Sequence, residues 1–323
     1  MTLFSVCTTD TLANAAKALR AGSLVAFPTE TVYGLGADAQ NEMAVARIYE
    51  VKGRPADHPL IVHIDSMERM EAWSSDIPEY AIKLARDYWP GPMTLVLKRS
   101  DTAKDFITGG QETVGLRVPA HPLALGLLAA FIDAGGLGIA APSANRFGAV
   151  SPTTADAVQE ELQEYMADSD LILDGGPSLV GVESTIIDCT GDVPKILRLG
   201  AITHEMITET TGLDVIDFGS STSDEDEIRV SGSLESHYSP KAKVILDVIA
   251  EPGDGLIAPD QIPTPNGVVR LMAPSTIEQY ARDLYRALRS ADQQGLQVVV
   301  VLQPGGDGLA AAIRDRLKRA AHE

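Results

Sequence analysis

Residues 24–36 read LVAFPTETVYGLG, and this stretch joins an apolar element to a polar turn. The apolar run 24–27 ends at Pro28, which predicts a short buried strand. Two threonines, a glutamate and a tyrosine follow at once. Side chains of this kind can cap backbone amides in a turn, but loops at strand ends also often carry functional sites. Taken alone, the stretch leaves both interpretations open.

Strand-like and helix-like segments alternate around this stretch through the first two-thirds of the chain. Helical spacing predicts helices over 41–51 and 154–166, which Asn41 and Thr154 would cap, and Pro122 would open a third over 123–133. Apolar runs predict strands at 60–64, 93–97, 137–141, 171–173, 185–188 and 195–199. This order predicts an α/β or α+β domain of roughly 200 residues.

The composition changes after this domain. Residues 217–236 read DFGSSTSDEDEIRVSGSLES, which is typical of a linker and has little apolar periodicity. A solvated tether is favoured, although a segment that folds over a neighbouring site would look the same. Beyond it, strands at 243–248, 268–272 and 297–302 alternate with helices at 277–289 and 309–319, as in a small parallel α/β domain. We therefore divide the chain into a first domain (1–205), a linker (206–236) and a Rossmann-like domain (237–323).

The charge of the chain limits its partners. Lys and Arg total 26 against 45 Asp and Glu, so the net charge of the 323 residues is −19. Stable nucleic-acid binding is not expected from such a balance, whereas a few cations in one pocket can still hold a small anion. The first residues lack the features of a signal peptide, and no apolar run reaches the ~20 residues of a membrane span. We expect a cytoplasmic protein with no membrane association.

Four cations stand where an anion site would need them. Lys52 and Arg54 flank a glycine at a predicted helix end, where they can wrap an anion or merely complement the helix dipole. Arg117 and Arg198 lie within apolar strands, and a buried arginine must meet an acid of the protein or an anion of a ligand. No nucleophile–base pair and no Walker A sequence is present. The residues predict a site that acts on small phosphates or carboxylates by positioning and electrostatics.

Several motifs, taken together, resemble the threonylcarbamoyl-AMP synthase family, the YrdC-like enzymes. They are FPTETVYGLG, the K-x-R at Lys52 and Arg54, PLIVHI, WPGPMTLVL, VGLRVPAHP, the S-x-N at Ser143 and Asn145, and GVESTIID. They occur in the family's order within about residues 10–205, and the restart HYSPKAKV resembles the longer, two-domain form. The resemblance implies a YrdC-like twisted mixed sheet with helices, followed by a smaller Rossmann-like α/β domain.

The family's reaction would make this chain a nucleotidyltransferase. It condenses L-threonine, bicarbonate and ATP into threonylcarbamoyl-AMP and pyrophosphate, and a separate complex transfers the product to tRNA. The reactants supply the nucleophiles, so the protein has to neutralise a triphosphate and orient two small anions with the help of Mg²⁺. No protein ligand for a metal is predicted, because His58 and His63 lack Cys or acidic partners at ligand spacing.

The resemblance also implies roles for individual residues. The predicted catalytic set is Lys52, Arg54, Ser143 and Asn145. Threonine would be held by Thr31, His63, Ala141, Ser184 and Arg117, the last on its carboxylate. The nucleotide would be contacted by Lys52, Arg54, His58, Thr113, Ser143, Asn145, Ser151 and Arg198.

The linker would pass over the active site, as in two-domain members, and is therefore a candidate lid. Glu235 stands where some members place a nucleotide-contacting tyrosine, so that contact is not carried over. Three alternatives remain at this point: a carbamoyl-transfer module like that of hydrogenase maturation proteins, a non-enzymatic RNA-binding module of translation, and an inactive relative. The first lacks the expected zinc-finger cysteines, the charge disfavours the second, and the retained site residues disfavour the third.

Overall fold

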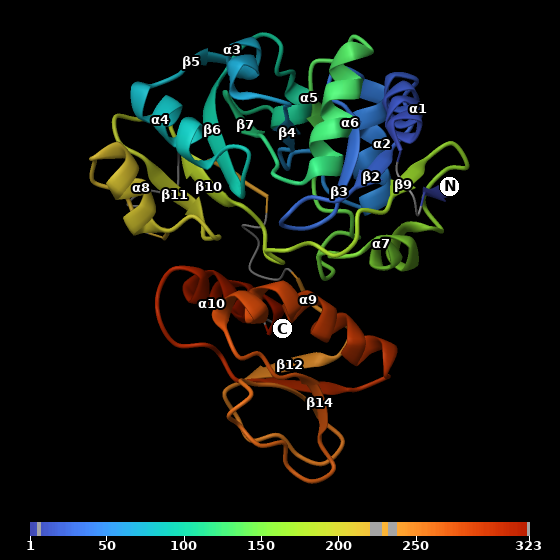
Figure 1. Cartoon of the computed structure of the whole chain (residues 1–323), viewed down its shortest axis with the longest axis vertical. Coiled ribbons are helices and arrows are strands. Elements are labelled where there is room, and N and C mark those ends of the chain that lie inside the picture. Colours follow the sequence, from blue (N-terminus) through green and yellow to red (C-terminus); the bar gives the residue numbers. More distant parts are fainter. Residues whose placement is uncertain (5–7, 220–227, 232–237, 322–323) are drawn as a thin grey trace.

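The computed structural model describes residues 1–4, 8–219, 228–231 and 238–321, which form two α/β parts (Figure 1). In Figure 1 the larger part lies above and holds the N-terminus, and the smaller part lies below. None of the helices in these described ranges is long and apolar enough to cross a membrane.

The larger part is built on a mixed sheet with the order β1-β9-β2-β3-β8-β4-β7-β6-β10-β11, and β5 pairs with β6. The strands are short and mostly buried, as expected for a sheet with covered faces. Their bounds are β1 (Thr2–Phe4), β2 (Val25–Phe27), β3 (Gly34–Asp38), β4 (Ile61–His63), β5 (Ser74–Asp76), β6 (Met93–Arg99), β7 (Thr113–Arg117), β8 (Ile139–Ala140), β9 (Leu171–Leu173), β10 (Thr185–Asp188) and β11 (Lys195–Arg198).

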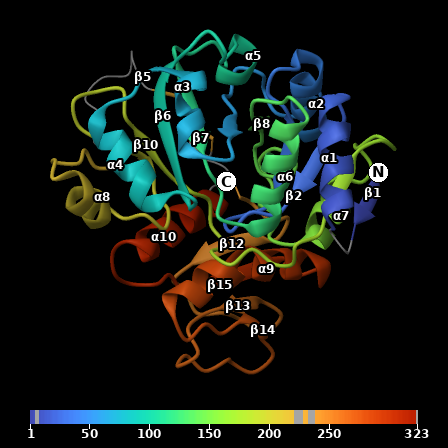
Figure 2. The same cartoon turned by 45° about the horizontal axis from the view of Figure 1, so that its top comes forward.

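Two pairs of helices pack on this sheet, α1 with α6 and α4 with α8. Both views show the two pairs toward opposite ends of the sheet (Figures 1 and 2). Asn41 and Thr154 cap α2 and α7 as predicted, and Pro122 opens α6. The bounds are α1 (Thr9–Arg20), α2 (Glu42–Lys52), η1 (Met67–Arg69), α3 (Met70–Trp73), α4 (Glu79–Tyr88), α5 (Asp105–Thr108), α6 (Pro122–Asp133), α7 (Ala155–Leu162) and α8 (His204–Thr211).

The central strands bring distant polar segments to one place. β4 and β7 run parallel, and their register sets His63 beside Arg117. The turn after β2 meets the loop after β8, where Gly34 forms a bridge with Ser143. A Cβ on Gly36 would lie 2.7 Å from a methyl carbon of Ile139, so the close approach of β3 and β8 needs a glycine.

The smaller part is a parallel sheet with the order β12-β15-β13-β14. Its two helices lie between this sheet and the larger part (Figure 1). They share a buried apolar cluster with Val32, Val150 and Val182 of the larger part, so the two parts pack against each other. The bounds are β12 (Lys243–Leu246), β13 (Gly255–Ile257), β14 (Val269–Met272), α9 (Ile277–Gln293), β15 (Val298–Val301) and α10 (Leu309–Ala320).

The predicted start of the linker at residue 206 is wrong. Helix α8 runs from His204 to Thr211 and packs against α4, and the chain after it still adds Val215 to the main core. Ile207 and Thr211 are buried at helical spacing in a segment that also contains many polar residues, which hid the helix in the composition. Residues 220–227 and 232–237, including Glu235, lie outside the described residues.

Candidate active site

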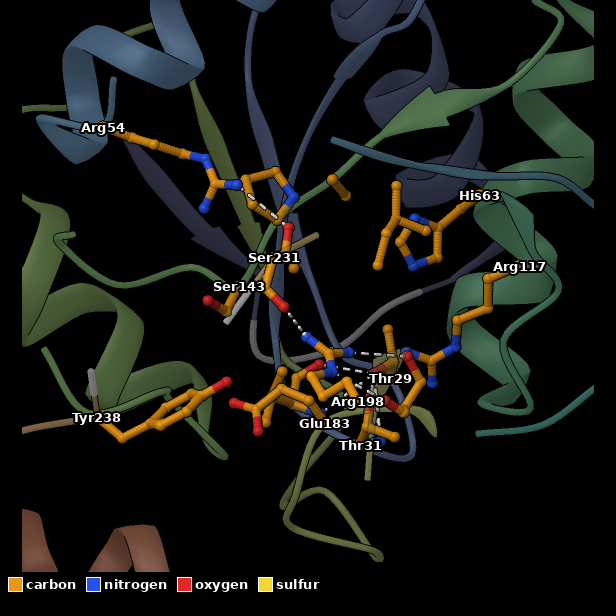
Figure 3. A pocket seen from close by; sticks show the side chains of 16 residues that line it. Thr29, Thr31, Arg54, His63, Arg117, Ser143, Glu183, Arg198, Ser231 and Tyr238 are labelled. Atoms are coloured by element: carbon orange, nitrogen blue, oxygen red, sulfur yellow. Dashed lines mark hydrogen bonds between the residues drawn. The ribbon is translucent and has the colours of Figure 1, made fainter. Parts of the chain in front are cut away.

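A cavity opens where these loops and strand ends meet (Figure 3). It receives residues from the turn after β2, the end of α2, the strands β4 and β7, the loop after β8, the turn before β10, and the end of β11. Ser231 and Tyr238 also line it. Its lining residues are Thr29, Thr31, Val32, Gly34, Arg54, Ile61, His63, Arg117, Ala141, Pro142, Ser143, Glu183, Ser184, Arg198, Ser231 and Tyr238.

The structure brings all five predicted threonine-side residues to this cavity. Eight predicted site residues line it: Thr31, Arg54, His63, Arg117, Ala141, Ser143, Ser184 and Arg198. Five others do not line it: Lys52, His58, Thr113, Asn145 and Ser151.

Arg117, a buried arginine on strand β7, pairs with an acidic residue of the protein. Its Nη2 donates to Glu30 Oε1 at 2.6 Å, and its Nε donates to the carbonyl of Gly91 at 3.3 Å. The second carboxylate oxygen of Glu30 accepts from the backbone amide of Ala120. Both side chains are buried, so Glu30 fixes the guanidinium at the cavity wall. The sequence placed Glu30 on the turn but did not pair it with Arg117.

Arg54 and Arg198 approach the cavity from two other elements and meet at Ser231 (Figure 3). Arg54 Nη2 donates to the hydroxyl of Ser231 at 3.2 Å, and Arg198 Nη1 donates to its carbonyl at 2.8 Å. Burial lowers the pKa of Arg54 to about 10 and also lowers that of Arg198. Both stay charged at neutral pH. Ser231 therefore lies between two cations on a segment that the linker prediction covered.

His63 lines the cavity from β4 and is neutral. Burial and the nearby charge of Arg117 lower its pKa to about 3. Its buried Nδ1 finds no hydrogen-bond partner within the part of the chain that the structure describes. On the turn after β2, the hydroxyls of Thr29 and Thr31 lie 2.9 Å apart. The cavity thus combines cations with neutral groups that can accept or donate a hydrogen bond.

Lys52 lies behind the cavity. Its Nζ donates to the carbonyl oxygens of Ser143, at 2.6 Å, and of Asn145. The Asn145 amide in turn donates to the carbonyls of Arg146 and Ala149, which leaves its buried Oδ1 without a partner in the described chain. Burial and the charge of Arg54 lower the pKa of Lys52 well below its usual range. In this structure Lys52 holds the loop that presents Ser143.

Three further predicted residues, His58, Thr113 and Ser151, do not line the cavity but lie near it. The His58 ring packs edge-on against Phe147, and burial lowers its pKa. Thr113 lines a small adjoining pocket beneath residues 228–231. Ser151 donates to Glu183 Oε1 at 2.7 Å and so contacts the cavity wall from behind.

Sequence reasoning missed Glu183, Ser231 and Tyr238 as lining residues. Glu183 stands inside GVESTIID, where an acidic residue directly before the predicted site residue Ser184 was an available signal. Ser231 and Tyr238 line the cavity through the tertiary arrangement of the chain, which no local pattern indicates.

Comparisons with known proteins agree with this geometry. A family model described as telomere recombination, covering Sua5, YciO and YrdC proteins, matches residues 17–200. A second, described as the threonylcarbamoyl-AMP synthase C-terminal domain, matches residues 202–322. The chain belongs to the threonylcarbamoyl-AMP synthase family.

Relatives of the same family match over nearly the whole chain. The threonylcarbamoyl-AMP synthase of Pyrococcus abyssi is 41% identical over 325 residues, covering 95% of this chain and 93% of the relative. That of Bacillus subtilis is 40% identical over 329 residues, covering 96% and 92%. The crystal structure of P. abyssi Sua5 with L-threonine has a TM-score of 0.88 and 38% identity, and covers 99% of this chain and 96% of that one.

The predictions of family, fold and enzyme class are therefore confirmed. The chain is a nucleotidyltransferase of the threonylcarbamoyl-AMP synthase family, with a YrdC-like sheet domain and a smaller C-terminal α/β domain.

Proposed function

We propose that the cavity is where this enzyme condenses L-threonine, bicarbonate and ATP into threonylcarbamoyl-AMP and pyrophosphate. One observation carries the proposal: Arg54, Arg117 and Arg198 come from three separate elements and all reach one cavity. Each of the three substrates is an anion or carries a carboxylate. A protein of net charge −19 that gathers three buried guanidiniums in one place has built a site for anions.

Threonine is assigned to the side of Arg117. A guanidinium already oriented by Glu30 can take a carboxylate without losing further side-chain freedom. Neutral His63 and the hydroxyls of Thr31 and Ser184 offer hydrogen bonds to the amine and hydroxyl, and Ala141 offers apolar and backbone contact. The similar P. abyssi Sua5, solved in complex with L-threonine, supports threonine as a ligand of this chain.

ATP is assigned to the side of Arg54, Arg198 and Ser143. Both arginines donate to Ser231 in the structure, so phosphate oxygens would take over contacts that this serine now supplies. Lys52 and Asn145 act through the backbone of the loop that carries Ser143. Segment 228–231 would therefore shift when the nucleotide enters, in keeping with the candidate lid.

Mg²⁺ is proposed to enter with ATP as part of the substrate. The cavity lining contributes cations, and Glu183, its one carboxylate among the described residues, already accepts three hydrogen bonds. No described cluster of His, Cys, Asp and Glu could hold a metal ion. The phosphates would hold the ion and share their charge with Arg54 and Arg198.

The reaction needs no protein nucleophile. The threonine amine attacks the carbon of bicarbonate, and water leaves to give a carbamate. A carbamate oxygen then attacks the α-phosphate and pyrophosphate leaves. The protein contributes by holding three anions in contact and by stabilising charge on the leaving group. The product would pass to a separate tRNA-modifying complex, which agrees with a chain too acidic to hold tRNA.

The direct test is pyrophosphate release from ATP in Mg²⁺ buffer, with threonine and bicarbonate omitted in turn and the nucleotides separated by chromatography. We expect release to need both co-substrates and to yield a new adenylate peak. Hydrolysis that is indifferent to threonine would remove the assignment. A filter-binding assay with tRNA checks the partner proposal, which salt-resistant binding would contradict.

A further inference from the structure

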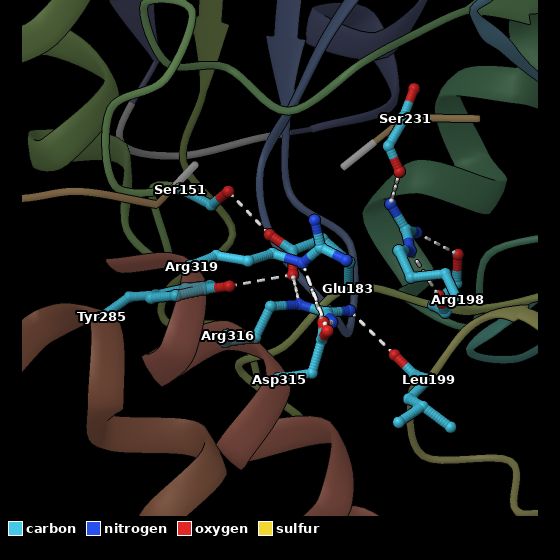
Figure 4. Close-up of polar contacts among 10 residues, drawn as sticks. Ser151, Glu183, Arg198, Leu199, Ser231, Tyr285, Asp315, Arg316 and Arg319 are labelled. Carbon is cyan, nitrogen blue, oxygen red and sulfur yellow. Dashed lines mark hydrogen bonds and ion pairs between the residues drawn. The ribbon is translucent and has the colours of Figure 1, made fainter. Parts of the chain in front are cut away.

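The two parts of the molecule meet at a buried charge cluster directly behind the cavity (Figure 4). Glu183 lines the cavity, and its Oε2 accepts from Arg316 Nε at 2.8 Å and from the hydroxyl of Tyr285 at 2.9 Å. Arg316 comes from α10 and Tyr285 from α9, both in the smaller part. Arg316 is 1% exposed and Glu183 is 6% exposed. A wall residue of the site is thus neutralised by the other domain.

Arg316 also contacts a second segment of the larger part, the residue directly after β11. Its Nη2 donates to the carbonyl of Leu199 at 2.8 Å. Glu183 directly precedes Ser184, and Leu199 directly follows Arg198. These two inner neighbours are bonded to each other, since Arg198 donates to the carbonyl and the hydroxyl of Ser184, each at 3.0 Å. Arg316 therefore binds the residue before Ser184 and the residue after Arg198, and Ser184 and Arg198 both line the cavity.

We propose that Arg316 is a positioning residue for the reaction, holding Ser184 and Arg198 in place by pairing with Glu183 and by binding the backbone of Leu199. This role rests on the proposed function, in which Arg198 faces the nucleotide. Without Arg316, the buried carboxylate would keep Arg198 as its remaining nearby cation and would draw it away from the cavity. The smaller domain then positions Ser184 and Arg198 through Arg316, and Arg316 itself does not contact substrate.

The charges around Glu183 predict how a variant without the Arg316 cation should respond to pH. Arg316 on α10 and Arg198 on β11 lower its pKa to about 2 against the effect of burial. Tyr285 on α9 and Tyr238 also face the cluster, and Asp315 pairs with Arg316 from the same helix. Removing Arg316 leaves burial in force and raises the pKa of Glu183 toward neutrality. In that variant, only the ionised form of Glu183 should draw Arg198 away from the cavity.

The test compares Arg316→Met with Glu183→Gln/Arg316→Met. We expect Arg316→Met to lower kcat/KM for ATP by about tenfold or more, the loss that a misplaced site residue brings. The loss should deepen from pH 6 to pH 9 relative to the wild type. The double variant has no buried unpaired charge and should recover most of kcat/KM and lose the extra pH dependence.

Arg314→Met is the matched control, because Arg314 lies on the same helix but donates to Pro304 and Gly306 within the smaller part. We expect it to keep wild-type kinetics. Should Arg316→Met fail to fold, Arg316→Gln with and without Glu183→Gln takes its place. Wild-type kinetics in Arg316→Met would overturn the positioning role, and a double variant no better than the single one would overturn its action through Glu183. A wild type that releases no pyrophosphate would instead overturn the proposed function itself.

Discussion

The cavity and the domain interface each contain a buried arginine, Arg54 and Arg316, and the two differ in their hydrogen bonding. At the interface, Arg316 donates to protein acceptors in Glu183, Asp315 and Leu199. At the cavity, the buried Nε of Arg54 and Nδ1 of His63 have no hydrogen-bond partner among the described residues. An unpaired buried polar atom is costly, and a ligand in the cavity would complete these two. The contrast is between Arg316 and Arg54 rather than between whole regions, because the interface arginine Arg289 also has a buried Nε without a partner in the described chain.

The largest expected effect tests the cavity side at Arg117. Arg117→Met removes the cation assigned to the threonine carboxylate and leaves Glu30 buried without its partner. We expect kcat/KM for threonine to fall by about 100-fold or more, roughly 3 kcal/mol. Steady-state pyrophosphate release at varied threonine measures it.

Glu30→Gln/Arg117→Met separates lost binding from lost folding at this pair. The double variant should regain thermal stability, because no charge is left unpaired, but not the threonine kinetics. If it regained both, Arg117 would act only by neutralising Glu30, as Arg316 is proposed to do for Glu183, and it would not bind the threonine carboxylate.

A smaller effect is expected at Arg54, which has the unpartnered Nε. Arg54→Met should raise KM for ATP about tenfold, near 1.4 kcal/mol, while KM for threonine stays within twofold. Arg54→Lys keeps the charge but not the planar fork, and should recover only part of the loss. An equal rise in both KM values would argue against a nucleotide-side role.

The two regions should also lose stability in different pH windows. The folded pKa of His63 lies near 3, below its usual 6.5, so the unfolded chain binds its proton first and stability falls as pH drops below about 6.5. Between pH 7 and 5 this costs about 2 kcal/mol. The folded pKa of Glu183 lies near 2, below its usual 4.5, so its contribution is lost only below about pH 4.5.

Urea unfolding at several pH values checks this order. His63→Gln should remove the loss between pH 7 and 5, and Glu183→Gln should leave that step in place while reducing the loss below pH 4.5. If His63→Gln retained the full loss above pH 5, His63 would not be neutral and buried as described.

The smallest effect is expected at the edge of the interface. Tyr285→Phe removes one hydrogen bond to Glu183 and leaves Arg316 in place. We expect unfolding to become easier by about 1–2 kcal/mol, with kcat and both KM values within twofold. Chemical denaturation and the pyrophosphate assay measure the two quantities. A large kinetic effect would mean that the interface acts on the site through more than the charge of Arg316.

Local patterns along the chain determine much of the fold. The cap at Asn41, the apolar strands 171–173 and 185–188, and the alternation after residue 243 all match the observed elements. These features depend on side-chain periodicity and capping, which neighbouring residues carry by themselves. Helix α1, which the prediction left out, and α8, which it assigned to the linker, show the limit. Their apolar faces are small, and only packing against α6 and α4 shows that they are buried.

The sequence by itself also determined the family and most of the chemistry at the site, because Arg54, His63, Arg117 and Ser184 stand within motifs whose order is readable along the chain. Only the tertiary structure decided what those residues meet. Arg117 pairs with Glu30 across 87 positions, and Arg316 pairs with Glu183 across 133. Partners of buried charges are chosen by sheet order and domain packing, since the cost of burial is met by whichever counter-charge the fold brings near. No local pattern in the sequence specifies that choice.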